Sequence, residues 1–528
     1  RYRNYSFEQV AEAARSAARN YLRELQIEPI EATTFQNLAA RLVFSDENLR
    51  AAPEILRRNV ESQKNLWAYG ISGDFPIIVV EVAAEKDFDL MRELLRAHKY
   101  LRRKSLRFDL VIVNKHGAGY EQNLQDALFV VVRDEIAAPN LLDQPGGIFV
   151  RREELIQPPD RNLLLSAARA YFAAGTTKTL AEILGEQTAT AFEPPELFAP
   201  VGKIKLESSG NYGSSAEINA NNKASELEFF NGLGGVDRAT GEYVIRLEKD
   251  VWTPAPWSNV VANRKDFGFL ITETGACCAW RGNSRENRLS PWSNDAVTDE
   301  SGEVFYLRDD GNGEFWSPTP LPARNGEPYA IRHGHGYTIF EHRTGGIEQE
   351  LTVFAALDEP VKISILRLTN KTRESRRISI FNYIEPVLGF AREQTARFIT
   401  TEFDPQSNAL FARNPYRPDF GASVAFLAAY AGEANRAMTY TGDRREFIGR
   451  NRGLENPAAL HRKNLSNRAG AGFDPCLAFQ TAIELLPEQA ETIVFLFGEC
   501  DRLGESRALI ERYRSSAAAN DALVEVQD

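Results

Sequence analysis

Two runs in the second half of the chain, KISILRLTN at residues 362–370 and RRISIFNYIE at residues 376–385, decide its fold. Their apolar residues alternate with polar ones, which is typical of β-strands. Similar runs recur between turn residues: EYVIRLE (242–248), FGFLITET (267–274), VFYLRDD (304–310), YTIFEHR (337–343), EQELTVFAAL (348–357), SVAFLAAY (423–430) and TIVFLFGE (492–499). The pattern predicts a large antiparallel β-sandwich over residues 226–505, which is more than twice the size of an immunoglobulin domain.

A different pattern precedes the sandwich. The short β-rich runs PIIVVEV (76–82) and FDLVIVN (108–114) flank DFDLMRELLRAHKYLRRK (87–104), whose leucines fall on one side of a helix. Strand, helix and strand over so short a distance form a βαβ unit, which requires parallel strands. Residues 1–190 are therefore predicted to form a small α/β domain with a short parallel sheet.

Other segments of the first domain are less regular. Helices are expected at 6–25, with Ser6 as N-cap, and at 160–174, and a strand is expected at 146–152. Residues 122–136 contain ALFVVV, which suits a strand, but their apolar residues keep helical spacing and a helix is favoured.

The domain boundaries follow from composition. Residues 191–225 are rich in Pro, Ser, Gly and Asn and are predicted to be a linker, and helical character returns at 506–528 as the start of a helical linker. The predicted fold class is thus α+β multidomain: a small α/β domain followed by a large antiparallel sandwich.

The composition of the chain argues against several classes of function. The 528 residues include 73 acidic and 62 basic residues, for a net charge of −11, which argues against binding of nucleic acid or an anionic membrane. Four cysteines form no disulfide pattern, so a reducing compartment is expected. No apolar run approaches the roughly 20 residues that span a bilayer. The chain begins RYRNYSFEQV without an initiator Met, so both ends are expected to be cut ends of a longer polypeptide.

The clearest candidate site is WRGNSRENRLSPWSND at residues 280–295. Tryptophans flank a run of amide, carboxylate and guanidinium side chains, and sugar recognition needs both flat apolar faces and paired donors and acceptors. Tryptophans in a sandwich are more often part of the core, and polar loops are often only solvated. The residues alone leave a ligand surface and a solvated loop equally open.

Other motifs give weaker evidence for a functional site. The run NGLGG at 231–235 lacks the Lys-Ser/Thr of a phosphate loop and is predicted to be a turn. His333 and His335 have no further ligands at metal-binding spacing, so no metal is expected, and they are interpreted as neutral hydrogen-bonding groups for a ligand. Ser72 in GISGD only loosely matches a nucleophile elbow. No catalytic set emerges from the motifs.

A family resemblance rests on the motifs as a set. FFNGLGGVDRATGEYVI, TPAPWSNVVAN, WRGNSRENRLSPWSND, RHGHGYTIFEH, GIEQELTVF and TGDRREFIGRN resemble the N-terminal β-supersandwich of glycoside hydrolase family 94, the family of cellobiose phosphorylases. FQNLAARLVFSDENLRAAPEILRRN, LWAYGISGDFPIIVVEV and LLRAHKYLRRKSLRFDLVIVN resemble the segment that precedes this sandwich in cyclic β-1,2-glucan synthases. The resemblance covers residues 33 to 513, and its forms are most similar to those synthases.

The resemblance implies a function. In the family an (α/α)6 barrel after the sandwich carries an Asp as general acid, and inorganic phosphate is the co-substrate that attacks with inversion. No residue of this chain is assigned a catalytic role, and no cofactor is expected. The chain is expected to be the non-catalytic, carbohydrate-binding front part of such an enzyme, acting with its barrel on a β-glucan or glucose oligosaccharide. The residues expected to line the sugar site are Trp280, Asn283, Arg285, Glu286, Asn287, Trp292, His333 and His335.

Alternatives stay open at this stage. The chain could be a freestanding glucan-binding protein without catalytic activity. A weaker hypothesis makes the α/β domain an enzyme, with a pocket at the carboxyl ends of PIIVVEV and FDLVIVN. The resemblance also implies a place on the cytoplasmic side, as part of an inner-membrane protein, and leaves a homodimer open.

Overall fold

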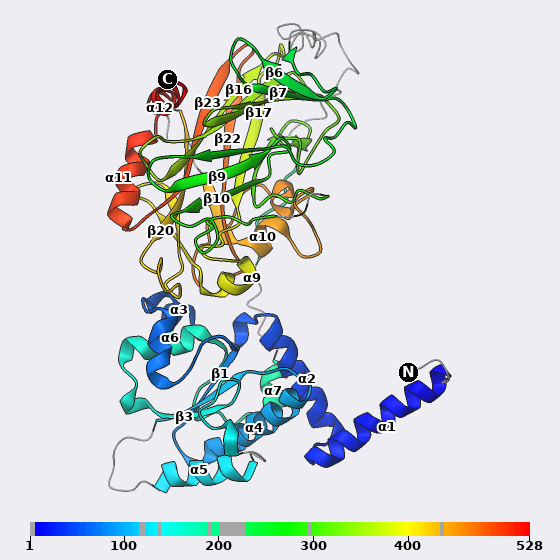
Figure 1. Cartoon of the computed structure of the whole chain (residues 1–528), viewed down its shortest axis with the longest axis vertical. Coiled ribbons are helices and arrows are strands. Elements are labelled where there is room, and N and C mark those ends of the chain that lie inside the picture. The colour runs from blue at the N-terminus through cyan, green and yellow to red at the C-terminus, as the bar shows by residue number, and fades with distance from the viewer. Residues whose placement is uncertain are drawn as a thin grey trace. The chain divides into compact units, whose positions relative to one another are not determined.

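The structure is a computed structural model that describes residues 6–115, 123–135, 139–186, 193–200, 227–293, 295, 297–432 and 438–528 (Figure 1). The chain divides into two compact units, one of Arg1–Phe192 with Tyr416–Asp419 and one of Glu193–Pro415 with Phe420–Asp528. Most of the predicted linker, 191–225, lies outside the described residues. In the described part of the chain, no helix combines the length and apolar character needed to cross a membrane.

The first unit is built around a parallel sheet. Its strands are β1 (Ile77–Val82), β2 (Asp109–Asn114), β3 (Ile148–Arg152) and β4 (Ala168–Phe172). Within the described residues the strand order is β3-β2-β1-β4, and all the pairings are parallel. Every residue of β1 and β2 is buried, as expected for apolar strands whose two faces are both covered. The predicted parallel βαβ unit is confirmed.

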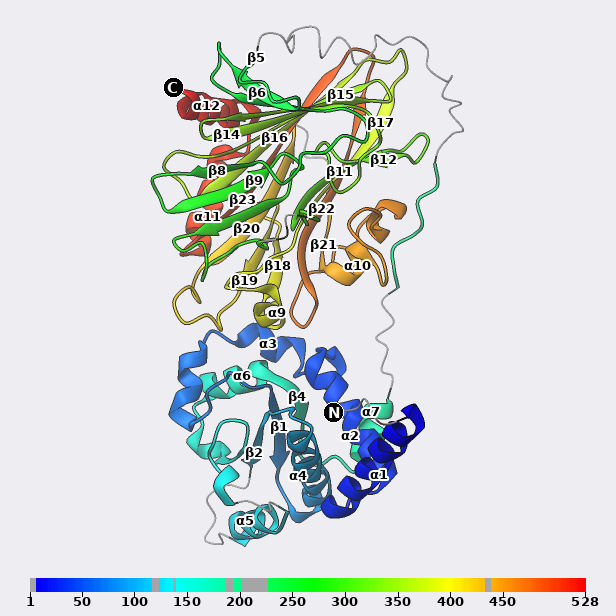
Figure 2. The ribbon, with the colours of Figure 1, turned by 45° about the vertical axis from the view of Figure 1, so that its right-hand side comes forward.

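Helices surround this sheet, and Figure 2 shows α4 lying along it. They are α1 (Phe7–Leu25), α2 (Pro29–Val43), α3 (Pro53–Arg58), α4 (Phe88–Arg103), α5 (Asn123–Glu135), α6 (Pro158–Ala167) and α7 (Leu180–Gly185), with short 3-10 turns at Glu47–Leu49, Gln63–Tyr69, Glu85–Asp87, Pro139–Leu141 and Glu153–Leu155. The choice of helix over strand at 122–136 is confirmed by α5.

One prediction in the first unit is wrong. The helix expected at 160–174 ends at Ala167, and β4 follows it at Ala168–Phe172. Ala168, Ala170 and Phe172 are buried in alternation, and β4 pairs with β1. Tertiary pairing with a central strand therefore overrides the local helical spacing.

The second unit is made of antiparallel sheets. Its strands are β5 (Leu227–Glu228), β6 (Gly234–Asp237), β7 (Tyr243–Leu247), β8 (Ser258–Ala262), β9 (Phe267–Thr272), β10 (Cys277–Arg281), β11 (Glu303–Asp309), β12 (Phe315–Trp316), β13 (Tyr329–Gly334), β14 (Tyr337–Thr344), β15 (Ile347–Ala355), β16 (Val361–Asn370), β17 (Arg376–Ile384), β18 (Thr400–Asp404), β19 (Ala409–Arg413), β20 (Val424–Ala431), β21 (Thr439–Asp443), β22 (Pro475–Leu485) and β23 (Ala490–Cys500). Among the described residues they form one large sheet, β18-β19-β20-β23-β16-β15-β14-β13-β7-β6-β5, and two smaller ones, β12-β11-β17-β22-β21 and β10-β9-β8. The predicted antiparallel sandwich and the α+β fold class are confirmed.

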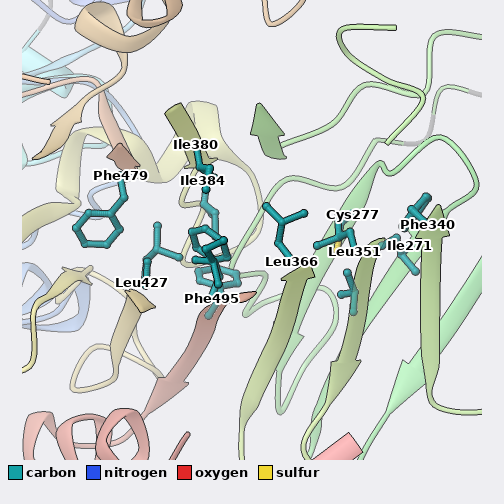
Figure 3. Close-up of a cluster of buried hydrophobic side chains, with 14 of the residues drawn as sticks. Ile271, Cys277, Phe340, Leu351, Leu366, Ile380, Ile384, Leu427, Phe479 and Phe495 are labelled. Carbon is teal, nitrogen blue, oxygen red and sulfur yellow. The ribbon is translucent and has the colours of Figure 1, made fainter. Parts of the chain in front are cut away.

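The main core lies between the large sheet and the two smaller ones (Figure 3). The large sheet contributes Leu366 of β16 and Phe495 of β23 to this core. The five-stranded sheet contributes Ile380 of β17, and the three-stranded sheet contributes Ile271 of β9. The opposite face of the large sheet is also covered, because α11 (Leu503–Tyr513) and α12 (Ser516–Gln527) pack there. Both faces of the central strands are therefore buried, which explains their strongly apolar sequences. Two short helices, α9 (Arg392–Thr395) and α10 (Arg444–Ile448), complete the unit.

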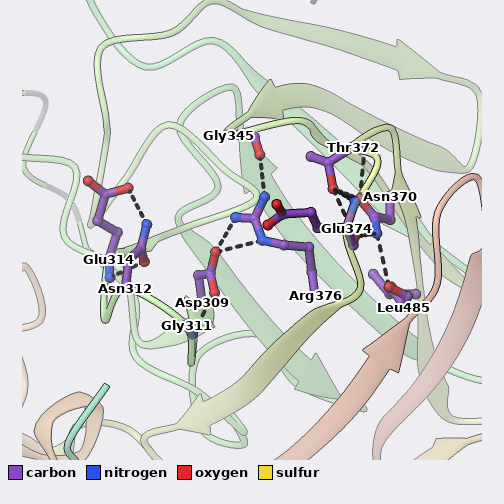
Figure 4. Close-up of polar contacts among 10 residues, drawn as sticks. All are labelled: Asp309, Gly311, Asn312, Glu314, Gly345, Asn370, Thr372, Glu374, Arg376 and Leu485. Atoms are coloured by element: carbon purple, nitrogen blue, oxygen red, sulfur yellow. Dashed lines mark hydrogen bonds and ion pairs between the residues drawn. The ribbon is translucent and has the colours of Figure 1, made fainter. Parts of the chain in front are cut away.

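One polar cluster ties the large sheet to the five-stranded sheet (Figure 4). Arg376, at the start of β17, donates through Nη1 to the carbonyl of Gly345, between β14 and β15 (2.9 Å), and through Nε to Asp309 Oδ2 in β11 (3.0 Å). Nearby, Asn370 Nδ2 donates to the carbonyls of Glu374 (2.8 Å) and Leu485 (2.9 Å). KISILRLTN and RRISIFNYIE thus belong to different sheets, and the cluster fixes the crossing between them.

Candidate functional site

The loop after β10 folds back along its own strand. Trp280 is in β10 and forms a β-bridge with Arg288, which in turn bridges Gly389. The backbone N–H of Leu289 donates to the carbonyl of Ala279 (2.8 Å). The polar stretch is therefore held by main-chain hydrogen bonds on both sides and does not extend freely into solvent.

The inward side of this loop is part of the protein's interior. Asn287 and Ser290 are fully buried. Asn287 Nδ2 donates to the carbonyl of Arg281 (2.9 Å) and to Glu499 Oε2 (2.6 Å). The hydroxyl of Ser290 donates to Glu303 Oε1 (2.5 Å) and accepts the N–H of Ala279 (2.8 Å). These side chains use their polar groups to anchor the loop.

The tip of the loop is an exposed turn. Asn283 Oδ1 accepts the backbone N–H groups of Arg285 (2.9 Å) and Glu286 (2.9 Å), which fixes the turn in the manner of an Asx motif. Arg285 and Glu286 are exposed and form an ion pair of 3.4 Å with each other. Their charged ends remain accessible at the rim.

The outward side of the loop carries aromatic rings and a guanidinium group. Arg288 Nη1 donates to the carbonyl of Phe390 (3.1 Å), and its Nε donates to the carbonyl of Ser284 (3.0 Å). Its guanidinium carbon lies 5.7 Å from the centre of the Trp292 ring and 5.4 Å from that of Phe390. Trp292 is 40% exposed and Phe390 is 36% exposed. Arg288 thus contacts both accessible rings by cation–π interaction, and its hydrogen bond to the carbonyl of Phe390 fixes the backbone beside one of them.

These rings border a cleft of about 470 Å³ within the second unit. Its charged and aromatic lining comes from Arg288, Trp292, Glu300, Glu385, Phe390, Arg392, Glu393 and Arg444. Glu385 is buried and pairs with Arg392 and, at 3.1 Å, with Arg444. Burial raises the pKa of Glu385, against the attraction of both arginines. The cleft therefore offers donors, acceptors and apolar faces together, a combination suited to a neutral ligand rich in hydroxyl groups.

Two further depressions adjoin this cleft. One of about 270 Å³ shares Trp292 and Glu300 with it, and another of about 400 Å³ shares Glu300, Glu385 and Arg444. Glu300 lines all three depressions, so they lie next to one another on the same surface. A surface of this extent can contact more than one sugar ring.

The two histidines lie elsewhere. His333 approaches Thr338 Oγ1 through Nδ1 (3.0 Å) and the carbonyl of Trp257 through Nε2 (3.2 Å), and burial lowers its pKa to about 4. His335 is exposed in the turn between β13 and β14. Trp257 immediately precedes the first residue of β8. Trp280 lies level with the other end of β8, across the intervening strand β9, because Trp280 and the last residue of β8 both pair with Gly268 of β9. The structure does not bring His333 next to Trp280.

No metal-binding group was found in the part of the chain that the structure describes: no three His, Cys, Asp or Glu side chains there could hold an ion. The four cysteines, Cys277, Cys278, Cys476 and Cys500, are all buried and free.

Several cleft residues were not identified from the sequence. Phe390, Arg392 and Glu393 follow β17 in a segment without any recognisable motif. The bridge between Arg288 and Gly389 and the hydrogen bond from Arg288 to the carbonyl of Phe390 bring this segment to the loop. Arg288 itself stands in the quoted loop, and its place between two aromatic residues was the one available signal.

In the first unit, the carboxyl edge of the sheet is occupied by the protein's own carboxylate. Asp87 accepts the backbone N–H groups of Ala83 (2.8 Å), Ala84 (3.1 Å) and Gly175 (2.7 Å). In open parallel sheets a bound phosphate usually lies at this edge, at the point where the strand order reverses. In the order β3-β2-β1-β4 this point lies between β1 and β4. Asp87 takes the donors that such a ligand would need.

The architecture defines the class of protein: a β-supersandwich, in which one large antiparallel sheet packs against smaller ones, preceded by a small parallel α/β unit. Residues 241–516 match the family described as glycosyl hydrolase 94, supersandwich domain. The chain belongs to this family.

Relatives with assigned functions span different parts of the chain. Cyclic β-(1,2)-glucan synthase NdvB of Rhizobium meliloti (strain 1021) is 32% identical over 499 residues, which are 94% of this chain and 17% of the synthase. N,N'-diacetylchitobiose phosphorylase of Vibrio proteolyticus is 26% identical over 304 residues, 56% of this chain and 36% of the phosphorylase. A bacterial glucoamylase complexed with acarbose superimposes with a TM-score of 0.32 at 9% identity over 54% of this chain and 40% of its own, a similarity too low to carry an argument.

Proposed function

We propose that the second unit forms part of a β-glucan-binding surface in a larger enzyme that transfers glycosyl groups, and that the cleft beside Trp292 holds the sugar. The observation that carries this proposal is the pair of accessible rings, Trp292 and Phe390, contacted by Arg288 at the edge of a cleft of about 470 Å³. The relatives named above act on glucans or on disaccharides, which supports a carbohydrate as ligand.

The physical basis is the match between the cleft and a pyranose ring. The C–H faces of the sugar stack on the rings, while its hydroxyl groups exchange hydrogen bonds with charged side chains such as Glu300 and Glu393, which are exposed. A partly open cleft buries only one side of the sugar, so binding to this chain is expected to be weak, with a dissociation constant of about 1 mM or more.

The catalytic chemistry belongs, in this proposal, to another part of the polypeptide. That part is an (α/α)6 barrel with the general acid, and inorganic phosphate is its co-substrate. This chain supplies binding contacts and no catalytic group, and the whole protein acts on the cytoplasmic side of the inner membrane. Trp280, Asn283, Arg285, Glu286, Asn287, His333 and His335 stay predictions as sugar contacts.

The test is a titration of the 528-residue chain with β-1,2-linked gluco-oligosaccharides, followed by NMR of the sugar or by tryptophan fluorescence. Trp292→Ala is expected to weaken binding at least about fivefold, because it removes an aromatic face worth about 1 kcal/mol or more. Trp252→Ala is the matched control: Trp252 is 46% exposed with the guanidinium of Arg324 4.5 Å from its ring, yet it lines none of the three depressions.

Two outcomes would reject the assignment of the cleft. One is unchanged affinity in Trp292→Ala, and the other is an equal loss in Trp252→Ala. Robust turnover of β-glucan by this chain alone would reject the division of labour between the chain and a separate barrel.

A further inference from the structure

The first helix extends beyond the core of its unit. In Figure 1, α1 projects away from α2 and α4, and none of its residues is buried. Only its C-terminal end is attached: Tyr21, Leu22 and Leu25 pack against the core, and the hydroxyl of Tyr21 donates to the carbonyl of Tyr100 (3.1 Å). Residues 7–20 form an overhang about 21 Å long. Helices of this length are marginal in water without a partner.

The overhang presents an apolar stripe. Phe7, Val10, Ala11, Ala14 and Ala18 follow one another at helical spacings of three and four residues. Phe7 is 83% exposed. Small alanines at the centre of the stripe allow a second helix to approach closely, and the larger residues at the end add contact area.

Charges flank one side of this stripe in an ordered sequence. Glu8 and Glu12 lie in the first half of the overhang, and Arg15 and Arg19 in the second. Within one chain, both arginines contact Glu12, at 3.0 Å and 2.7 Å, and all three side chains are more than half exposed. The overhang is thus acidic at one end, basic at the other and neutral in total.

This arrangement distinguishes between partners. An anionic membrane surface is bound by helices with an excess of Lys and Arg, which the overhang lacks. A second copy of the same helix fits in the antiparallel direction, because the flank with charges then faces the same flank of its partner, acidic end against basic end. In a parallel pair the charged flank of one helix would face the uncharged flank of the other, which carries Gln9, Ala13 and Ala17, so no ion pairs would form between the helices.

We propose that the α1 overhang is a self-association surface, on which two copies of the chain pair as antiparallel helices. In the register that uses only the overhang, Ala13 of one copy faces Ala14 of the other. Glu8 then faces Arg19 and Glu12 faces Arg15 across the interface, so each acidic residue meets a basic one. A single pair of short helices buries less surface than a permanent dimer, so the association is weak and depends on concentration.

Sedimentation velocity of the full chain over a concentration series tests the proposal. A reversible monomer–dimer equilibrium is expected. The variant Glu8→Arg/Glu12→Arg and the variant Arg15→Glu/Arg19→Glu each turn all cross-helix pairs repulsive, so each dimer should dissociate at least about tenfold more readily. An equimolar mixture of the two should restore association, which a merely unfolded helix could not do. Glu54→Arg/Arg57→Glu, which reverses an exposed ion pair in α3, is the control and should leave the equilibrium unchanged.

Cysteine cross-linking tests the direction. Ala14→Cys is expected to form a disulfide-linked dimer, since residue 14 lies at the centre of the antiparallel register. Val10→Cys is not, since residue 10 of one copy lies opposite residue 17 of the other. The native cysteines are buried and do not compete. A monomer at every concentration, association indifferent to charge reversal, or equal cross-linking of both variants would overturn the proposal.

Discussion

Lys362 is the group whose removal should reveal how the candidate loop is anchored. It lies on β16 inside the sandwich, and its ammonium group forms an ion pair with Glu303 and contacts Cys277 Sγ at 3.2 Å. The side chains of Lys362 and Glu303 are each 6% exposed. Glu303 also accepts the hydroxyl of Ser290, so the ion pair connects the large sheet to the loop that ends in Trp292.

The expected effect follows from the cost of an isolated buried charge. Lys362→Met leaves the carboxylate of Glu303 with the Ser290 hydroxyl as a donor but without its cation, and breaking a buried pair in this way costs about 3–5 kcal/mol. Lys362→Met with Glu303→Gln removes both charges, and Gln keeps an acceptor for Ser290. The double variant is therefore expected to lie within about 1.5 kcal/mol of the parent.

Urea unfolding at pH 7 measures these differences. Tryptophan fluorescence reports mainly on the second unit, because Trp252, Trp257, Trp280, Trp292 and Trp316 lie there and only Trp67 lies in the first. For a unit of this size a loss of about 4 kcal/mol lowers the midpoint by about 1–2 M.

The control is a surface lysine. The side chain of Lys371 is one-third exposed, and its ammonium group lies 3.1 Å from the carboxylate of Glu488. Lys371→Met removes this exposed ion pair and should change the free energy of unfolding by at most about 0.5 kcal/mol. The reasoning is refuted if Lys362→Met behaves like Lys371→Met, or if the double variant is as unstable as the single one.

Three further outcomes are expected. Arg376→Met, which removes the cation paired with buried Asp309, should lower the free energy of unfolding by about 3 kcal/mol, and an unchanged urea midpoint would show that the sheet crossing does not depend on it. Asn287→Ala should cost about 1–3 kcal/mol, since it removes a donor from buried Glu499, whereas Asn283→Ala in the exposed turn should cost less than about 1 kcal/mol in the same assay. Burial lowers the pKa of His98, His333 and His342 to about 4 from 6.5, so between these values the unfolded chain binds more protons. Their contribution to stability is complete above pH 6.5 and is lost as the pH falls to 4; urea midpoints at pH 7 and pH 5 test this, and a higher midpoint at pH 5 would contradict it.

Local pattern was enough for most elements of both units. The strands at 76–82 and 108–114 and the helix between them were predictable because a run of β-branched residues and a helix with a one-sided leucine stripe each have one favoured structure. The segment 160–174 was not, because its alanines suit a helix as well as a strand and only pairing with β1 decides between them. Strand pairing is a contact between distant segments, and spacing within one segment carries no information about it.

The same limit applies to the candidate site. From residues 280–295 the sequence by itself determined that aromatic, amide and guanidinium groups occur together, which is a matter of composition. The sequence could not distinguish the role of Asn287 from that of Trp292, because both belong to the same polar loop. In the structure the loop folds back along β10, so that the amide of Asn287 points inward and donates to Glu499, whereas the ring of Trp292 points outward and borders the cleft. Only the tertiary structure brought Phe390, Glu385 and Arg444 to that loop and left His333 by the opposite end of β8. The physical reason is that a cleft forms where side chains from distant strands and turns converge, and sheet order and register, not local sequence, decide which of them meet.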